Sequence, residues 1–487
     1  MIPENAINQY SITQPVSSSM FFGRKDELNE IIDNRLRQFP PISTILIGGR
    51  KIGKTSLLFK IRDQILSSPI CLDSSRAIPI YISLQSLDII GSHFLFQAII
   101  VELVSQLKLL FGITFPIGEL SEREPYRSFM QIMTFITTEC HSKLGKIRFA
   151  LLLDEAERLL GHSWTTDVIS NLRDLINTSP LNSFFVLVIT GFREFHDYAI
   201  SEEDGIGSIL GNAAYWTHLG VLSKDDASDL ISKPINGKIT PEIIDLVYEE
   251  SGGHPAVTQF IMQQALEGGS REITKDLIMS ICRNARKKIR IFSSWLSKFD
   301  EKDRLTYLLI TQSKGNITYK DILKNKPKEI NPSQIQESLD FLCYSGVICQ
   351  ENDNYTVAGC LFRDWFLIFG VRMKDGNMKN PNDKSRNFDM RKFIVSSIIA
   401  ILIFVVTIAV LVWASSLVSP VTLAFVLIVA LVFDMISIVT VLVINDVVLP
   451  KWAMNFYNNV LTKIPILKPL NLDIKQKTGK SEQEEDM

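Results

Sequence analysis

The stretch S-T-I-L-I-G-G-R-K-I-G-K-T-S, residues 43–56, decides the predicted fold. The apolar run 45–47 ends in a loop that matches G-x-x-x-x-G-K-T from Gly48 to Thr55, and an apolar-patterned helix is expected over 56–66. The glycines of such a loop let backbone N–H groups point at phosphate oxygens, and the helix N-terminus adds partial positive charge. Strand, loop and helix together predict a nucleotide site rather than a chance match in a flexible loop.

Several residues of this phosphate loop, residues 48–56, have a predicted role. Lys54 is expected to reach the β- and γ-phosphates, and Thr55 is expected to ligate Mg²⁺. The predicted nucleotide-binding set from the loop is Gly48, Gly49, Gly53, Lys54, Thr55 and Ser56. The expected cofactors are therefore ATP or ADP together with Mg²⁺.

Two carboxylates follow a second hydrophobic strand. The run I-R-F-A-L-L-L-D-E, residues 147–155, ends in Asp154 and Glu155. If this strand ends beside the phosphate loop, Asp154 joins the Mg²⁺ shell, and Glu155 polarises the water that attacks the γ-phosphate. The competing interpretation makes Asp154 the N-cap of a short helix over 156–160.

A polar pair follows another predicted strand, F-F-V-L-V-I-T at 184–190. Thr190 at its end can contact the attacking water, and Arg193 can reach the γ-phosphate through its planar guanidinium. The alternative is an ordinary strand end followed by a solvated arginine. The predicted catalytic set is Glu155, Arg193 and Thr190.

The alternation of strands and helices predicts an α/β fold of the P-loop NTPase type, with a parallel sheet covered by helices on both faces. Further strands are expected at 78–84 and 215–219, and helices dominate beyond residue 223. The predicted layout is a polar arm at 1–20, a P-loop ATPase core at 21–222, a helical lid at 223–296, a winged-helix domain at 297–372, a linker at 373–392, transmembrane helices at 393–418 and 421–448, and a tail at 449–487.

Composition adds few constraints on this 487-residue chain, whose length suits two or three domains. Its 51 basic and 53 acidic residues nearly cancel, so the overall charge does not indicate a nucleic-acid partner. The six cysteines have no paired metal spacing, which is typical of reduced, mostly buried thiols in the cytosol. No basic segment followed by an apolar core opens the chain, so no signal peptide is expected.

A series of short motifs recurs in a recognisable order: G-R at 23–24, the phosphate loop, D-E at 154–155, T-G-F-R at 190–193, H-L-G-V-L-S-K-D-D-A at 218–227 and G-G-H-P at 252–255. Over residues 20–370 this order resembles the STAND class of AAA+-related P-loop ATPases, in particular origin-recognition-like AAA-like domains and archaeal-type ATPases.

The resemblance implies site residues and a mode of action. It implies that Gly23 and Arg24 lie near the adenine, and that His254 and Pro255 lie near the nucleotide and report its state to the lid. Without the resemblance, His254 is simply a turn residue between two helices. Such proteins are typically switches that are compact with ADP and oligomeric with ATP, so an ATP-dependent homo-oligomer is expected.

Residues 298–370 look like a winged helix, with helices at 303–313, 317–324 and 332–345 and a strand pair at 347–357. Between Glu329 and Phe362 there is no lysine or arginine, whereas five residues are acidic. Such a surface repels phosphates, so we do not expect DNA binding. We expect instead that this module is a clamp that faces another protein. The basic cluster at 283–290 is interpreted as a solvated face or an inter-domain hinge.

The apolar sequence that begins at residue 393 predicts attachment to a membrane. Residues 393–433 contain no charged residue, and a single helix of that length would span ~60 Å, about twice the hydrocarbon core of a bilayer. Two spans are therefore expected, and the basic residues that flank them predict a multi-pass cell-membrane protein with the ATPase and the C-terminus on the cytosolic side. Asp434, near the centre of the second span, is either a pore or helix-association site or a neutral carboxyl bonded within one hairpin.

Together these features predict a membrane-anchored STAND-type switch that hydrolyses ATP slowly to ADP and phosphate, with the transmembrane hairpin as a possible effector in signalling or defence. The expected partners are the membrane, further copies of the chain and a protein trigger. Two alternatives stay open: a membrane-tethered, DNA-associated ATPase or regulator, and a nucleotide-binding scaffold with little turnover.

Overall fold

The computed structural model describes residues 9–16, 20–87, 91–116, 118–200, 210–236, 239–267, 272–288, 290–313, 316–326 and 330–370. The predicted linker, both predicted transmembrane helices, Asp434 and the predicted tail lie outside these residues. All six cysteines lie within them and are free; Cys71, Cys140 and Cys282 are buried, whereas Cys343, Cys349 and Cys360 are only partly buried.

The predicted parallel α/β fold is confirmed by a five-stranded sheet. Its strands are β1 Thr44–Gly48, β2 Arg76–Ser83, β3 Ile147–Asp154, β4 Phe185–Gly191 and β5 Tyr215–Leu219, in the order β2-β3-β4-β1-β5. Every pairing is parallel, with Ser83 opposite Asp154 and Ile47 opposite Gly191. The carboxyl ends of β1, β3 and β4 therefore meet at one edge of the sheet, where α/β proteins bind their ligands.

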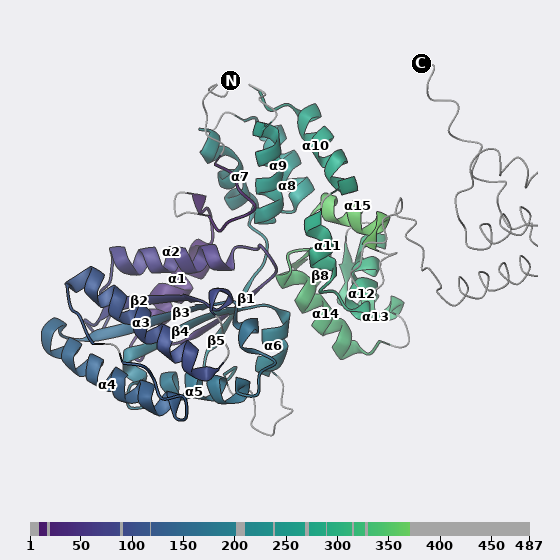
Figure 1. Cartoon of the computed structure of the whole chain (residues 1–487). Helices are drawn as coiled ribbons and strands as arrows, with labels where there is room; N and C mark the ends of the chain where they lie inside the picture. Colours follow the sequence, from purple (N-terminus) through teal and green to yellow (C-terminus); the bar gives the residue numbers. More distant parts are fainter. Residues whose placement is uncertain are drawn as a thin grey trace, which may run out of the picture. The chain divides into compact units, whose positions relative to one another are not determined.

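Helices cover both faces of this sheet (Figure 1). One face carries α1 Lys25–Ile31, a π-helical turn Ile32–Leu36 and α2 Lys54–Ser67; the other carries α3 Ser92–Phe111, α4 Pro125–Leu144 and α5 Thr165–Asn177. Successive strand residues enter opposite layers, so that Leu46 packs with α2 whereas Ile45 and Ile47 pack with α3 to α5. This two-sided burial explains why the strands are continuous apolar runs rather than alternating ones.

Among the described residues, one helix is long and apolar enough to cross a membrane, namely α3. Its buried side chains recur at three- and four-residue spacing, as at Leu95, Ile99 and Leu103. It packs against β2 and α4, so in this fold it is a core helix of the α/β layer.

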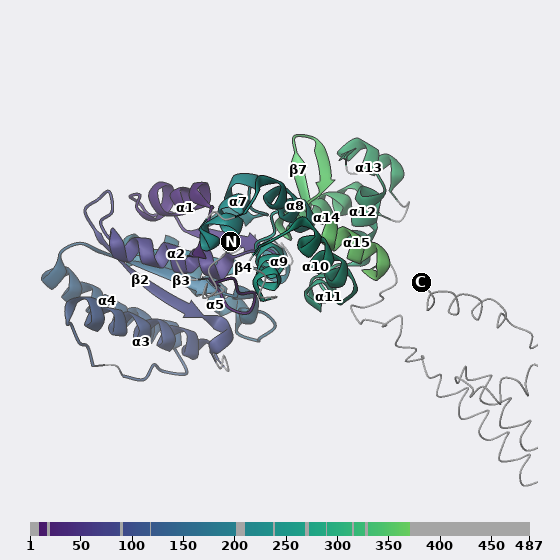
Figure 2. The ribbon, with the colours of Figure 1, turned by 90° about the horizontal axis from the view of Figure 1, so that it is seen from above.

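A helical lid follows β5, and Figure 2 shows its helices gathered together. They are α7 Lys224–Ser232, α8 Pro241–Ser251, α9 Pro255–Glu267 and α10 Lys275–Lys288. The first one begins at a side-chain cap, because the hydroxyl of Ser223 accepts a hydrogen bond from the Asp226 N–H at 3.1 Å. Arg286 of the predicted basic cluster pairs with Glu250 in α8 at 2.7 Å and with Asp364 at 2.8 Å, and so joins the lid to the last helix of the described chain.

The elements after the lid form the C-terminal module. They are α11 Arg290–Leu296, α12 Glu301–Gln312, β6 Ile317–Thr318, α13 Tyr319–Asn325, α14 Pro332–Tyr344, β7 Ile348–Glu351, β8 Asn354–Val357 and α15 Cys360–Ile368. The start of the predicted second helix is corrected, because Ile317 and Thr318 pair with β8 as a short strand of the antiparallel sheet β6-β8-β7. Phe362 and Trp365 of α15 pack on Phe292 of α11. The identification of this module as a winged helix stays a prediction.

Candidate functional site

The phosphate loop folds as the spacing predicts, with β1 before it and α2 directly after it. Gly53, at the start of α2, has φ 107°, a left-handed conformation that favours glycine. The Lys54 ammonium donates to the carbonyl of Gly48 at 2.7 Å and to that of Gly49 at 3.0 Å. Burial lowers the pKa of Lys54, while nearby carboxylates oppose this shift. Lys54 is therefore folded back over its own loop, where a phosphate group would give it a charged partner.

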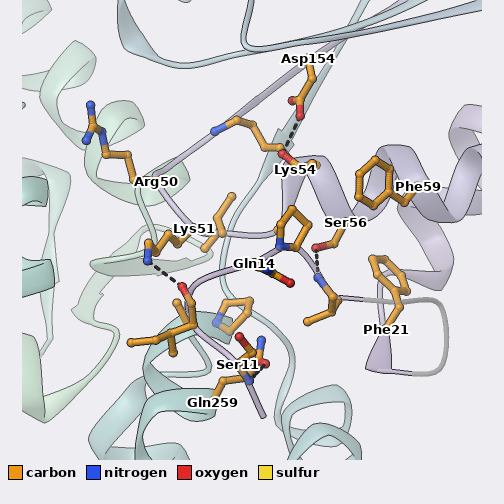
Figure 3. A pocket seen from close by; sticks show the side chains of 18 of the residues that line it. Ser11, Gln14, Phe21, Arg50, Lys51, Lys54, Ser56, Phe59, Asp154 and Gln259 are labelled. Atoms are coloured by element: carbon orange, nitrogen blue, oxygen red, sulfur yellow. Dashed lines mark hydrogen bonds between the residues drawn. The ribbon is translucent and has the colours of Figure 1, made fainter. Parts of the chain in front are cut away.

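Asp154 accepts hydrogen bonds from three different elements at the edge of the sheet. The hydroxyl of Thr55 donates to Oδ2 at 2.6 Å, a contact drawn at the top of Figure 3, and the hydroxyl of Thr190 donates to Oδ1 at 2.5 Å. The hydroxyl of Tyr81, in β2, donates to Oδ2 at 3.2 Å. Hydroxyl and carboxylate oxygens are what Mg²⁺ prefers, and one or two protein ligands plus phosphate oxygens are its usual set. Thr55 and Asp154 therefore fit the ion.

Glu155 lies next to Asp154 in a left-handed conformation, with φ 64°. Its N–H donates to the Thr190 hydroxyl at 3.2 Å. Burial raises the pKa of its carboxyl, and the charges of Asp154 and Glu157 add to that shift. When the amide nitrogen of Gln85 faces Glu155, it lies 2.8 Å from Oε2. A half-buried carboxylate held in this way suits general-base work on a water.

Two expectations about these residues are corrected. The N-cap position of the short helix Ala156–Leu159 is occupied by Glu155, so Asp154 is not its cap. Thr190 is fully buried, and its hydroxyl donates to the Asp154 carboxylate and accepts the backbone N–H of Glu155. It therefore positions Asp154 and Glu155, and does not face the space where a water would react.

A cleft of about 630 Å³ opens above the phosphate loop (Figure 3). The predicted site residues that line it are Arg24, Gly53, Lys54, Thr55, Ser56, Asp154, Glu155 and Pro255. The predicted residues outside its lining are Gly23, Gly48, Gly49, Thr190, Arg193 and His254. The cleft also takes in the chain segment 11–16 and side chains from the lid, among them Gln259.

Gly49 contacts the C-terminal module. This contact corrects the prediction that Gly49 binds the nucleotide. Its N–H donates to the carbonyl of Tyr344 at 2.7 Å. A Cβ at this position would lie 2.8 Å from both Cα and the carbonyl oxygen of Ser345, closer than real side chains approach a backbone. The close approach of α14 thus requires glycine at 49.

Arg193 also faces the C-terminal module, at the start of α6 Arg193–Ile200. Its guanidinium pairs with Asp300 at 2.7 Å and with the buried Asp303, and lies 4.4 Å from the ring centre of Phe341. The prediction that Arg193 reaches the γ-phosphate is therefore wrong for this conformation, because two carboxylates of the C-terminal module hold the side chain elsewhere.

Gly23 and Arg24 join the core to the lid. Gly23 has φ 74°, and a Cβ there would lie 2.4 Å from Cγ of Asp226 at the start of α7. Arg24 is buried, and its Nη2 donates to the carbonyl of Gly220 at 2.5 Å, just after β5. Arg24 lines the cleft while Gly23 packs behind it.

His254 is buried beneath the cleft, with its ring centre 4.3 Å from that of Trp295. Burial, together with the positive charge of Arg24, lowers the pKa of His254 to about 3. The ring is therefore neutral near pH 7. His254 lies outside the lining of the cleft, whereas the next residue, Pro255, lines it.

Sequence reasoning missed three contributors to this site: Tyr81, Gln85 and the segment 11–16. A tyrosine near the end of a buried strand was the available signal for Tyr81, because its hydroxyl needs a polar partner at that edge. No signal in the sequence pointed to the segment 11–16, because its partners in the lid and the phosphate loop are distant along the chain.

Replacing Thr55 by alanine is expected to remove most of the gain in ATP affinity that Mg²⁺ provides. The expected loss is roughly ten- to a hundredfold, because mutating residues that merely contact metal ligands already lowers metal affinity by that factor. ATP titrated by calorimetry with Mg²⁺ and with EDTA measures this gain. Thr55→Ser keeps the hydroxyl and is expected to keep the gain. Equal Mg²⁺ dependence in Thr55→Ala and the wild type would contradict the ligand assignment.

Comparison with known proteins found no matching family model and no matching curated protein. Among solved structures, the Walker-type ATPase PABY2304 of Pyrococcus abyssi is 19% identical, with 73% of this chain and 99% of that chain covered and a TM-score of 0.47. Cdc6p from Pyrobaculum aerophilum is 17% identical, with 72% and 94% covered and a TM-score of 0.38. The Thermotoga maritima RuvB Holliday junction branch migration motor is 14% identical, with 71% and 96% covered and a TM-score of 0.35. The function proposed below follows from the geometry of the site.

Proposed function

We propose that the chain binds ATP with Mg²⁺ and hydrolyses it slowly, as an AAA+-related P-loop ATPase. One observation carries the proposal: Lys54, Thr55 and Asp154 bring an ammonium, a hydroxyl and a carboxylate to one edge of the cleft, with Glu155 beside them. The Lys54 ammonium would bind phosphate oxygens, the Thr55 hydroxyl and the Asp154 carboxylate would hold Mg²⁺, and the Glu155 carboxylate would accept a proton from the attacking water.

The proposed role of this ATPase is that of a STAND-type switch. The C-terminal module contacts the phosphate loop through Gly49 and Tyr344, and holds Arg193 through Asp300 and Asp303. A nucleotide in the cleft and the docked module would thus both contact the phosphate loop and the end of β4. This shared contact supports a coupling between the nucleotide state and the position of the module.

Membrane anchoring, a cytosolic ATPase and ATP-dependent self-assembly complete the proposal, and they are supported by the uncharged stretch 393–433 and by the sequence resemblance. Two observations disfavour a DNA-associated role. Arg286 is engaged by Glu250 and Asp364, and the exposed face of α14 carries Glu337 and Asp340.

The mass of the detergent-solubilised full chain tests the switch. Glu155→Gln protein, used to slow hydrolysis, is expected to be monomeric with ADP and assembled with Mg²⁺–ATP. One unchanging mass with both nucleotides would overturn the switch and leave a constitutive ATPase or a scaffold.

Asp300→Asn provides the mutational arm of this experiment. Asparagine still caps α12, but it removes one of the two negative charges that hold Arg193. Because the module is then held less tightly, the assembled fraction at a fixed ATP concentration is expected to rise roughly two- to fivefold. The matched control is Glu337→Gln, which breaks the 2.6 Å ion pair with Lys302 inside the C-terminal module. Equal assembly of both variants would show that the contact with Arg193 does not hold the module.

A further inference from the structure

Residues 10–16, the strap, cross the cleft between the lid and the phosphate loop (Figure 3). On the lid side, the hydroxyl of Tyr10 donates to the carbonyl of Ile231 in α7 at 2.7 Å. Next to it, the N–H of Ser11 donates to Oε1 of Gln259 in α9 at 3.2 Å. Two different lid helices therefore hold the first two residues of the strap.

The other end of the strap is held by the phosphate loop itself. Nζ of Lys51 donates to the carbonyl of Ile12 at 2.7 Å, and the N–H of Val16 donates to the hydroxyl of Ser56 at 3.2 Å. Lys51 has φ 59° at the apex of the loop. Lys51 lies within the phosphate loop and Ser56 belongs to the predicted nucleotide-binding set, so the strap reaches the loop where the phosphates would lie.

The position of the strap is fixed by one buried anchor. Tyr10 is only 3% exposed and belongs to the main hydrophobic core, whereas Ser11 to Val16 line the cleft and carry no charge. An uncharged segment does not repel a polyphosphate. The hydrogen bonds that hold the strap to the lid are neutral, and such bonds are individually weak, so they can open while the Tyr10 ring stays in the core and the fold stays intact.

We propose that the strap is a clasp that ties the lid to the phosphate loop over bound nucleotide and so limits the rate of nucleotide exchange. The proposal rests on the proposed function, because it needs ATP or ADP in the cleft. The nucleotide enters and leaves when the Tyr10 and Ser11 contacts open, and a closed clasp keeps the switch in its current state.

Release of fluorescent ADP from the full chain, chased with excess unlabelled ADP in a stopped-flow instrument, tests the clasp. Tyr10→Phe removes only the hydroxyl that bonds Ile231, and Gln259→Ala removes the acceptor for Ser11. Each change is expected to speed release about threefold, and the double variant about tenfold. Entry is expected to accelerate as well, so the equilibrium affinity changes less than the release rate.

The matched control is Tyr126→Phe, because the hydroxyl of Tyr126 likewise bonds a distant partner, Asp174 at 2.7 Å, away from the cleft. It is expected to release ADP at the wild-type rate. Wild-type release rates in the strap variants, or equal acceleration in Tyr126→Phe, would overturn the clasp alone. If the wild type binds no nucleotide and matches Lys54→Ala, the proposed function falls and the clasp with it. Melting temperatures close to the wild type confirm that the variants are folded.

Discussion

Lys54→Ala is expected to weaken Mg²⁺–ATP binding by roughly a hundredfold or more, because hydrogen bonds to a charged group contribute about 1.5–3 kcal/mol each. Within the described part of the chain, the ammonium donates its hydrogen bonds only to the carbonyls of Gly48 and Gly49, and burial lowers its pKa. A phosphate group replaces those neutral acceptors with charged ones. The gain therefore arises only when nucleotide is bound, and the variant should keep its fold while losing its ligand.

Calorimetric titration of ATP measures this effect. Lys60→Ala is the matched control, since it removes a lysine from the same helix, α2, at a position outside the lining of the cleft. It is expected to bind ATP as the wild type does. If Lys54→Ala retains the wild-type affinity, the phosphate-loop assignment is wrong.

Glu155→Gln is expected to lower ATP turnover by roughly 10²–10⁴-fold, the usual contribution of a positioned general base, while ATP affinity stays within a few-fold of the wild type. Glutamine keeps the size of the side chain and its contact with Gln85, but it cannot take a proton from water. The raised pKa of Glu155 supports this role, because burial makes the carboxylate a stronger base.

Phosphate release under saturating Mg²⁺–ATP measures the change in turnover, and equilibrium titration shows that binding persists. Glu157→Gln is the control, because Glu157 also lines the cleft but belongs to the short helix after the strand end. A control that loses as much activity as Glu155→Gln would assign the effect to the general loss of negative charge.

Much of the core follows from patterns that are local in the chain. The phosphate loop needs a strand, two glycines, a lysine and a threonine within a few residues, and the D-E pair needs only the strand before it. The apolar runs of β1, β3 and β4 must be buried on both faces, so they must pair in one sheet, and their polar ends then meet at one edge. The contact between Thr55 and Asp154 was therefore predictable from the sequence.

The exact neighbours of Arg193, Gly49 and the strap were not predictable in this way. Arg193 pairs with Asp300, 107 positions further along the chain, and Ser11 bonds Gln259, 248 positions away. Such contacts depend on how the lid and the C-terminal module dock, which no periodicity or motif encodes. A sequence match could suggest a family role for Arg193, but it could not show which of two charged partners, phosphate or carboxylate, holds the side chain in this conformation.

The sequence by itself determined the α/β fold and the groups that could hold a nucleotide and Mg²⁺, because these depend on residue spacing within single loops and strand ends. The tertiary structure decided that Gly49 bonds the C-terminal module, that Arg193 is held by Asp300 and Asp303, and that residues 10–16 close over the cleft. The physical reason is that a side chain pairs with the best complementary group that packing brings within reach, and packing is a property of the whole fold.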